Sequence, residues 1–414
     1  MHVVLAPVGS AGDVLPFVAL GRTLRERGHE VVLLANEHFR NIVESAGLDF
    51  SPNGTKELYA AILEHPDLWH PTRSPSYLLD RFIEYTPMAF EALMERSRPG
   101  GSLLVSSPTN FGALIAREKL GVPLVTMTVA TPSILSFEGP MVTAELKRIQ
   151  WVPGWLRRAL VRFAFERRLR HPIEAVRAGA GLAPIGTSML TWWARSPERV
   201  VGLFPEWFQP YRKDWPRQTR VTGFVLDGGP PSFSTPPGLL EFLEAGVPPV
   251  VFTAGTANKQ AGDFYSVAAR AARRGGFRAV LLTPYAEQVP SELPQDVVRY
   301  DYAPLSEVLP RSAALVHHGG SGTLAQALAA GIPQLIVPFA LDQPENAIRV
   351  HDLGAGTCLA RAAMDERTLT EKIALVLNDS RFRSTACEFA ARMKRENALD
   401  QVTKILEELG ASLR

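Results

Sequence analysis

Hydrophobic and polar positions alternate between two periods over the first fifty residues. A continuous apolar run at Val3–Pro7 is followed by a glycine-rich turn, and Val14–Arg27 then carries apolar residues at helical spacing up to Gly28. The same order recurs, with an apolar run at Glu30–Ala35 and a helical pattern at Glu37–Ala46. Continuous apolar runs are typical of strands buried on both faces, so this alternation predicts a parallel sheet with right-handed helical crossovers.

Similar elements are predicted along most of the chain. Strands at Leu103–Ser106 and Pro123–Thr128 flank a helix at Phe111–Leu120, and the Pro-, Gly- and Ser-rich segment Asp214–Pro237 is predicted to link two domains. A second series of strands is predicted at Val221–Phe224, Pro249–Thr253, Ala279–Leu282, Val297–Tyr300, Ala314–His317 and Gln334–Pro338. The final helical pattern is Asp400–Leu409.

This pattern predicts an α/β protein with two doubly wound, Rossmann-like domains. We expect them at residues 1–215 and 216–395, with a C-terminal helix in 396–414 that packs back on the first domain. Two such domains would place a ligand cleft where the carboxyl ends of the two sheets face each other.

Composition narrows the class of protein. The 414 residues include 44 Lys and Arg against 42 Asp and Glu, and this balance gives no charge footprint for nucleic-acid binding. The two cysteines, Cys358 and Cys387, are too few for a disulfide framework or a multi-cysteine metal site. The chain opens on a strand rather than a signal-peptide pattern, so we expect a cytoplasmic protein.

A glycine-rich turn follows the predicted strand that ends at His317. The segment His317-His318-Gly-Gly-Ser-Gly-Thr323 leads into a helical pattern that ends at Gly331. Backbone N–H groups at such a turn and the start of the following helix form an anion site. A tight turn with one buried and one exposed histidine fits the pattern equally well, and neither the dinucleotide nor the P-loop motif is present.

A second polar segment follows the next predicted strand. Pro338-Phe-Ala-Leu-Asp342-Gln343 offers a carboxylate and an amide, which together accept and donate the hydrogen bonds that sugar hydroxyls need. Taken alone, Asp342-Gln343 is more often a helix cap.

Together these segments resemble the donor-binding signature of family-1 glycosyltransferases, which have the two-domain GT-B fold. The likeness rests on His318-Gly-Gly-Ser-Gly-Thr323 and on Pro338, Asp342, Gln343 and Asn346. Gly9–Phe17 resembles the amino-terminal loop of bacterial members, and Tyr302–Leu305 resembles their nucleobase-binding segment. Further segments resemble the rhamnosyltransferases of rhamnolipid synthesis in particular: Leu203–Phe208, Asp214–Pro216, Val221–Phe224 and Gly262–Tyr265.

The resemblance implies roles for individual residues on the donor side. His318, the backbone at Gly320, Ser321 and Gly322, and the Thr323 hydroxyl would bind the diphosphate of a dTDP- or UDP-sugar. Tyr302 would stack on the base, and Asp342 and Gln343 would hold the transferred sugar. Gly255 and Thr256, which follow another predicted strand, are a further phosphate contact or a structural turn.

Asp13 is the predicted catalytic base, with His318 as its catalytic partner at the leaving group. Inverting transfer needs a group that takes the proton of the attacking acceptor hydroxyl. The alternative is that Asp13, placed just before a helix, is an N-cap worth about 1 kcal/mol. Both roles can coexist.

Two features of the sequence bear on the donor nucleotide and on metal use: departures from the family pattern and the lack of a metal-binding motif. Family members that use UDP-sugars commonly have Gln where Leu305 stands and a ribose-binding Glu where Gln326 stands, which favours a deoxyribose donor such as dTDP-rhamnose. No Asp-x-Asp metal motif is present, so we expect no metal and no cofactor beyond the co-substrate.

The acceptor is predicted to be hydrophobic and hydroxylated, with contacts at Gly12, Trp69 and Phe137. Core packing explains the two aromatic residues nearly as well. The basic stretch 147–171 carries eight Lys and Arg with interspersed aromatic residues, and it fits either peripheral membrane contact or an ordinary solvated helix.

The predicted function is therefore inverting transfer of a sugar, with dTDP-rhamnose favoured and a lipid-like acceptor. The alternative within the class is UDP-glucose-dependent transfer to a sterol, polyketide or phenol. A nucleotide-sugar epimerase or hydrolase, and a non-catalytic binding partner, remain as alternatives outside it.

Overall fold

The computed structural model describes residues 1–137, 151–226 and 234–411. The chain forms two compact units. Unit 1 comprises Met1–Ile62, Thr72–Asp227 and Asn397–Arg414, and unit 2 comprises Leu63–Pro71 and Gly228–Glu396.

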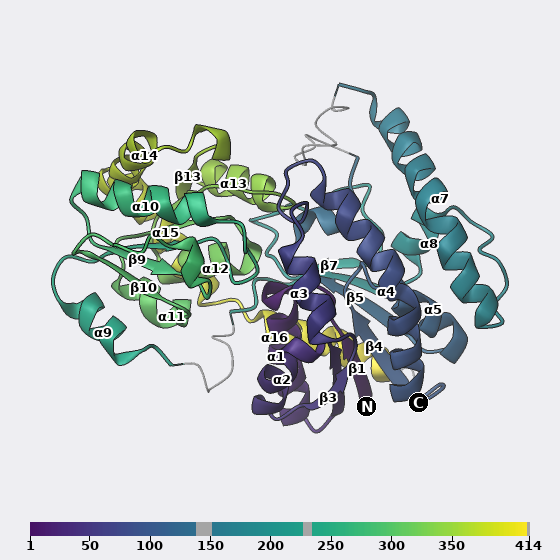
Figure 1. Cartoon of the computed structure of the whole chain (residues 1–414). Coiled ribbons are helices and arrows are strands. Elements are labelled where there is room, and N and C mark those ends of the chain that lie inside the picture. The colour runs from purple at the N-terminus through teal and green to yellow at the C-terminus, as the bar shows by residue number, and fades with distance from the viewer. Residues whose placement is uncertain (138–150, 227–233, 412–414) are drawn as a thin grey trace. The chain divides into compact units, whose positions relative to one another are not determined.

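Unit 1 is built on a seven-stranded parallel sheet in the order β3-β2-β1-β4-β5-β6-β7 (Figure 1). Its strands are β1 (His2–Ala6), β2 (Glu30–Ala35), β3 (Asp49–Pro52), β4 (Ser102–Ser106), β5 (Leu124–Thr128), β6 (Arg199–Gly202) and β7 (Thr219–Val221). Its helices are α1 (Ala11–Glu26), α2 (Arg40–Ser45), α4 (Ser74–Arg96), α5 (Phe111–Leu120), α7 (Gly154–Gly179), α8 (Met189–Arg195) and α16 (Ala398–Ala411), while α3 (Lys56–Glu64) runs into the segment of unit 2.

The strands of unit 1 are apolar throughout because helices cover both faces of the sheet. Val3 and Leu5 face a core shared with α1 and α16, whereas Val4 and Ala6 face a core shared with α4, α5, α7 and α8. Successive side chains of a strand point to opposite faces, so a fully apolar strand supplies both cores.

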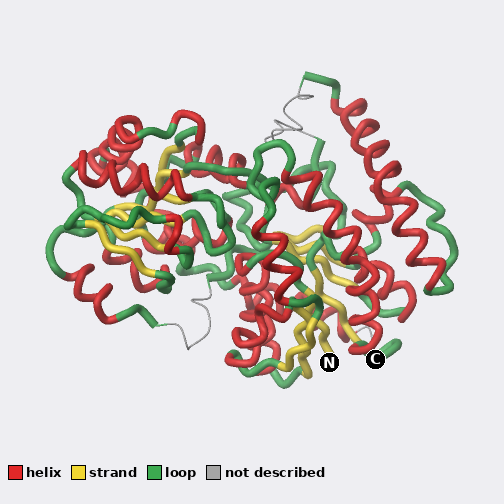
Figure 2. The backbone as a smooth tube through the Cα atoms, viewed as in Figure 1, coloured by secondary structure: helices red, strands yellow, loops and turns green. Residues whose placement is uncertain are grey.

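Unit 2 repeats this architecture with a six-stranded parallel sheet in the order β10-β9-β8-β11-β12-β13. Its strands are β8 (Val250–Thr253), β9 (Ala279–Leu282), β10 (Val297–Tyr300), β11 (Ala314–His317), β12 (Gln334–Ile336) and β13 (Gly356–Cys358). Its helices are α9 (Pro237–Glu244), α10 (Gly262–Gly275), α11 (Leu305–Val308), α12 (Ser321–Ala330), α13 (Gln343–Asp352), α14 (Glu366–Asn378) and α15 (Ser380–Met393). In each unit the strands lie between layers of helices (Figure 2), which confirms the two predicted doubly wound domains.

Two parts of the chain differ from the sequence prediction. The strand predicted at Val221–Phe224 lies at Thr219–Val221, and it pairs with β6 at the edge of the first sheet rather than opening the second. Strands β3, β6 and β13 were not predicted, because each contains charged, polar or glycine residues and therefore has no continuous apolar run.

A short segment of the amino-terminal half, Leu63–Pro71, belongs to unit 2 instead of the expected first domain. Trp69 packs against the core of unit 2, and its Nε1 donates to the carbonyl oxygen of Ala257 at 3.3 Å. Gln260 Nε2 donates to the carbonyl oxygen of His65 at 2.8 Å. At the other end of the chain, Val402 and Leu406 of α16 are buried against unit 1, and α16 packs on α1.

Within the described ranges, no helix is both long and apolar enough to cross a bilayer. The basic stretch 147–171 falls on α7 from Gly154 onward, whereas Lys147 and Arg148 lie outside the described residues.

Candidate active site

Three candidate residues, Gly255, His318 and Asp13, follow strands at which a sheet reverses its order. In unit 2 the order reverses between β8 and β11, whose carboxyl ends lead into Gly255 and His318. In unit 1 it reverses between β1 and β4, and Gly9–Asp13 follows β1. Ligands of doubly wound sheets bind outside the carboxyl ends of strands at such a reversal.

The imidazole of His318 lies between two glycines. A Cβ on Gly320 would lie 2.5 Å from its Nε2, and a Cβ on Gly255 would lie 2.9 Å from its Cε1. Gly255 also has φ +85°, a backbone conformation that other residues rarely adopt. The ring therefore occupies a space that requires glycine on both sides.

Burial keeps His318 neutral. It lowers the pKa of His318 to about 4, with the backbone of Thr253 acting in the opposite direction. At neutral pH the imidazole is thus a hydrogen-bonding group without charge. It can bind an anionic oxygen through one ring N–H, which its neutral form retains.

The preceding histidine has a structural role. His317 is fully buried, and its Nδ1 accepts a hydrogen bond from the Gly319 N–H at 3.1 Å. Its Nε2 then carries the proton and donates to Gln334 Oε1 at 3.0 Å. Both histidines are buried, so the reading of a plain turn with one exposed histidine is wrong.

Helix α12 begins at Ser321, directly after the N-cap residue Gly320. The first N–H groups of an α-helix have no partner within the helix, and they carry a partial positive charge. Gly322 in this first turn is exposed, and Thr323 is half-buried. The helix start and the neutral His318 thus lie together, and this arrangement can bind an anion without a formal positive charge on either group.

Asp342 is fixed by hydrogen bonds from two neighbouring segments. Its Oδ2 accepts from Ser321 Oγ at 3.1 Å and from Asn346 Nδ2 at 2.9 Å. Asn346 Nδ2 also lies 2.9 Å from the carbonyl oxygen of Gly319. Asp342 occupies the N-cap position of α13 but makes no capping bond, and burial raises the pKa of its carboxyl group.

Gln343 supports the turn before α13. Its Oε1 accepts from the N–H groups of Phe339 at 2.8 Å and Ala340 at 3.2 Å. Within this turn Leu341 has φ +61°, the one described residue other than glycine with a positive φ. Such strain persists only where the surroundings fix it and is concentrated at ligand sites.

Two further predicted donor contacts lie after neighbouring strands. Thr256 is exposed three residues beyond β8, where its carbonyl oxygen accepts from the Tyr285 hydroxyl at 2.9 Å. Tyr302 is half-buried two residues beyond β10. Because all strands of this sheet are parallel, both residues follow the same edge as His318.

The capping alternative assumed that Asp13 lies just before the helix. In the structure it lies in the first turn of α1. The N-cap is Ser10, and Asp13 Oδ2 accepts from the Ser10 backbone N–H at 2.8 Å as part of a capping box. Gly9 has φ +139°, and a Cβ there would lie 2.2 Å from Asp13 Oδ2. These contacts place the carboxylate in a capping box at the start of α1.

The three predicted acceptor contacts have different surroundings. Gly12 is exposed in unit 1, beside Asp13. Phe137 is buried in unit 1, where its carbonyl oxygen accepts from Arg157 and its N–H donates to Asp214 at 2.6 Å. Trp69 belongs to unit 2.

Sequence reasoning assigned no role to three residues that hold the site together, namely His317, Gln334 and Asn346, although His317 and Asn346 lie within the motifs it singled out. Their polar side chains are fully buried. Gln334 stands inside a predicted strand, and such a polar residue among apolar ones is the signal that could have revealed it.

Within the described ranges, no group of three or more His, Cys, Asp and Glu is placed to hold a metal ion.

Comparison with known proteins matches both units. Residues 3–132 match the glycosyltransferase family 28 N-terminal domain, and residues 279–409 match the erythromycin biosynthesis protein CIII-like C-terminal domain. An O-mycaminosyltylonolide 6-deoxyallosyltransferase of Streptomyces fradiae is 31% identical over 99% of this chain and 97% of its own length. A sterol 3-beta-glucosyltransferase of Arabidopsis thaliana is 27% identical over 98% of this chain and 65% of its own length.

Among solved structures, the spinosyn rhamnosyltransferase SpnG complexed with thymidine diphosphate superposes with a TM-score of 0.69. It is 21% identical and covers 98% of this chain and 100% of its own. At this level of identity the likeness shows the fold.

Proposed function

Because the chain belongs to the glycosyltransferases of the erythromycin biosynthesis protein CIII-like type, we propose that it transfers a 6-deoxyhexose from a dTDP-sugar to a hydrophobic hydroxylated acceptor. Rhamnose is the favoured sugar. The transfer proceeds with inversion and without a metal ion. The observation that carries the proposal is the neutral His318 set between Gly255 and Gly320 at the start of α12.

In this proposal unit 2 binds the donor. The α12 N–H groups, the Thr323 hydroxyl and His318 hold the diphosphate, with Gly255 and Thr256 beside it, and Tyr302 stacks on the thymine. As the bond between the anomeric carbon and the diphosphate breaks, negative charge develops on the leaving group. The helix start stabilises that charge, in place of a metal ion.

Asp342 and Gln343 orient the sugar. The Asp342 carboxylate is fixed by Ser321 and Asn346, so it accepts from sugar hydroxyls without losing side-chain entropy on binding.

Asp13 of unit 1 is the proposed base. The acceptor hydroxyl oxygen forms a bond to the anomeric carbon, its proton passes to Asp13, and the electrons of the broken bond leave with dTDP. Gly12 and Phe137 in unit 1 and Trp69 in unit 2 are the proposed acceptor contacts. A proton acceptor of this kind contributes about 10²- to 10⁴-fold to the rate.

The sugar and nucleotide are chosen on two grounds. Gln326 and Leu305 replace the side chains that the UDP-sugar enzymes of the family commonly use. The name of the Streptomyces relative also specifies a 6-deoxyallosyl group. The likeness to rhamnolipid rhamnosyltransferases adds hydroxy-fatty acids to the acceptor classes that we propose.

A second candidate is transfer of glucose from UDP-glucose to a sterol. The 27% identical Arabidopsis sterol 3-beta-glucosyltransferase, which matches over 98% of this chain, favours it.

The test is a matrix of dTDP- and UDP-sugars against macrolide, sterol, phenolic and hydroxy-fatty-acid acceptors, read by mass spectrometry. We expect a product with a dTDP-6-deoxysugar, an inverted anomeric centre, and unchanged activity in EDTA. Product with UDP-glucose alone would select the second candidate. Donor loss in controls without acceptor, or a strict need for a divalent metal ion, would contradict the mechanism.

A further inference from the structure

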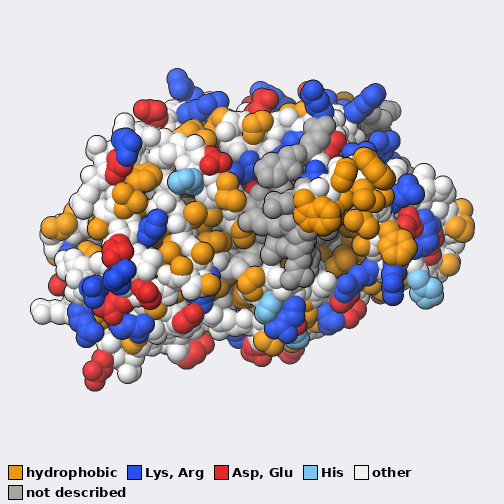
Figure 3. All heavy atoms as spheres, turned by 90° about the horizontal axis from the view of Figure 1, so that it is seen from above, with side chains coloured by type: hydrophobic (Ala, Val, Ile, Leu, Met, Phe, Trp, Pro, Cys, Tyr) orange, Lys and Arg blue, Asp and Glu red, His pale blue; other side chains and the backbone are white. Residues whose placement is uncertain are grey.

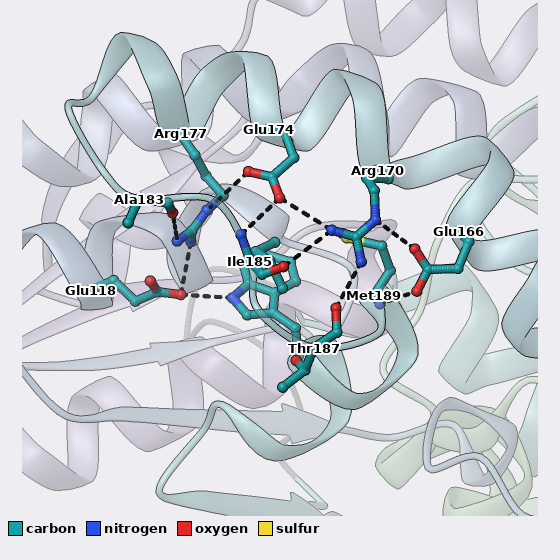
Figure 4. Close-up of polar contacts among 10 residues, drawn as sticks. Glu118, Glu166, Arg170, Glu174, Arg177, Ala183, Ile185, Thr187 and Met189 are labelled. Atoms are coloured by element: carbon teal, nitrogen blue, oxygen red, sulfur yellow. Dashed lines mark hydrogen bonds and ion pairs between the residues drawn. The ribbon is translucent and has the colours of Figure 1, made fainter.

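Helix α7 has two halves with different surroundings. In its carboxyl-terminal half Leu169 and Ile173 are fully buried against unit 1. Arg170 lies between Glu166 and Glu174, and Arg177 pairs with Glu118 at 2.9 Å (Figure 4).

The same network extends to the segment that follows α7. Arg177 donates to the carbonyl oxygen of Ala183 at 2.8 Å, and Glu174 accepts from the Ile185 N–H at 2.8 Å. Glu118 also accepts from Trp192 Nε1 of α8 at 2.6 Å. One end of α7 is thus rigidly fixed to unit 1.

The amino-terminal half presents large apolar side chains to solvent. Trp155 is 73% exposed, Phe163 is 64% exposed and Leu160 is 44% exposed, and Trp151, just before the helix, is 81% exposed. Trp155, Ala159 and Phe163 are four residues apart, so they form one stripe along the helix. Soluble proteins rarely gather such side chains without function.

Exposed arginines flank this stripe. Arg158 and Arg162 lie three and seven residues after Trp155, on one side of the stripe, and Arg167 lies on the other. Asp214 lies 3.7 Å from the Arg158 guanidinium and offsets part of its charge. The one acidic residue in 151–170 is Glu166, and its carboxylate is occupied by Arg170 and by the Met189 N–H. On the face in Figure 3, hydrophobic side chains likewise gather among Lys and Arg.

We propose that this half of α7, residues 151–167, docks the protein on a membrane surface that carries anionic lipid headgroups. Indole and phenyl rings partition into the boundary between headgroups and acyl chains, and arginine guanidinium groups reach from there to lipid phosphates. The exposed aromatic stripe of α7 has positive charge on both flanks, and this charge is complementary to a surface of anionic headgroups. The proposal concerns residues of unit 1, whereas the proposed donor contacts belong to unit 2, and it holds whichever sugar the enzyme transfers.

The test is co-sedimentation of the full chain with phosphatidylcholine vesicles and with vesicles containing phosphatidylglycerol. We expect binding to the anionic vesicles that weakens as salt is raised from 0.05 to 0.5 M, since salt screens exposed charges. Each basic residue at such a surface contributes about fivefold, equivalent to about 1 kcal/mol. The Arg162→Gln/Arg167→Gln double variant should therefore bind about 25-fold more weakly.

A second variant, Trp155→Ser/Phe163→Ser, should lose binding while its thermal unfolding midpoint stays unchanged, because both side chains are exposed. The matched controls are Val247→Ser, 74% exposed in unit 2, and Arg273→Gln, exposed on α10, and both should bind as wild type does. Equal binding to neutral vesicles would overturn the proposal. So would an absence of binding, or concentration-dependent self-association that Trp155→Ser/Phe163→Ser abolishes in place of vesicle binding.

Discussion

His318 occupies space that only a glycine at position 320 leaves open, because a Cβ on Gly320 would lie 2.5 Å from Nε2 of the imidazole. The N-cap residue of α12 thus also sets where the histidine ring lies. The turn between β11 and α12 therefore holds a neutral imidazole beside the first N–H groups of a helix.

We expect Gly320→Ala to displace the imidazole. Overpacking of this kind costs about 1–3 kcal/mol, so the free energy of unfolding should fall by that amount. Affinity for dTDP should fall at least tenfold, since the ring moves away from the diphosphate. Urea denaturation and isothermal titration calorimetry with dTDP measure the two effects.

Gly322→Ala is the matched control for stability. A Cβ on Gly322 meets nothing within 4 Å, and alanine is favoured over glycine in a helix by about 1 kcal/mol. This variant should be as stable as wild type or more stable. Equal destabilisation by the two substitutions would contradict the steric argument.

We expect stability to fall in acid because of His318. Burial lowers its pKa to about 4 from 6.5, so between these values the unfolded chain binds a proton that the folded protein does not. The contribution of His318 to the free energy of unfolding should therefore decrease by about 1.4 kcal/mol per pH unit as pH falls over this range, and it should stop changing below about pH 4. His317, whose pKa burial lowers to about 3, adds a similar decrease that a His318 variant retains.

His318→Gln removes this contribution, so its stability should depend less steeply on pH than that of wild type. Urea denaturation at about pH 7.5, 6 and 5 measures the slopes. His351→Gln, at an exposed position on α13, should leave the slope as in wild type. Parallel profiles for wild type and His318→Gln would show that the imidazole is not buried in neutral form.

We expect Asp13→Asn to fold normally but to lose about 10²- to 10⁴-fold in kcat, because the amide cannot take a proton from the acceptor. The amide oxygen can still accept from the Ser10 N–H, so the start of α1 is preserved. Affinity for dTDP should stay within threefold. Turnover assays and calorimetry separate the two effects.

Asp365→Asn is the control for a purely structural aspartate. Asp365 caps α14 by accepting from the Thr368 N–H at 2.7 Å, and its substitution should leave turnover unchanged. Near wild-type turnover in Asp13→Asn would leave Asp13 as a capping residue only.

The sequence predicted the sheets well because their central strands are buried on both faces. An apolar run such as Val3–Pro7 is stable where both of its faces are covered, and glycines such as Gly28 and Gly47 mark helix ends that precede a strand. The segment Leu63–Pro71 could not be placed in the same way. Its contacts with Ala257 and Gln260 are formed by residues almost 200 positions away.

For the candidate site, two local motifs predicted the two turns that carry His318 and Asp342. It could not predict that His317 and Asn346 are the supporting residues. Their hydrogen bonds to Gln334 and Gly319 depend on the register of β12 against β11 and on the packing of α13, which no short-range pattern encodes.

We expect Gln326→Glu to shift the enzyme toward UDP-sugars. Gln326 lies on α12 in the position that resembles the ribose-binding Glu of other family members, and a carboxylate there would accept from both ribose hydroxyls. A charged hydrogen bond contributes about 1.5–3 kcal/mol, so the ratio of kcat/KM for UDP- to dTDP-sugar should rise at least tenfold. Competition assays with both donors measure it, and an unchanged ratio would remove Gln326 from the nucleotide pocket.

The remaining prediction separates sugar binding from diphosphate binding. Asp342→Asn keeps the shape of the side chain and an oxygen that accepts from Ser321, but it removes the charge that sugar hydroxyls would donate to. We expect kcat/KM for the sugar nucleotide to fall about 10- to 100-fold while affinity for free dTDP stays within threefold, because the α12 N–H groups are untouched. Asp352→Asn, exposed at the end of α13, is the matched control and should behave as wild type. A parallel loss of dTDP affinity in Asp342→Asn would mean that the carboxylate acts by holding Ser321 at the start of α12 and not by contact with the sugar.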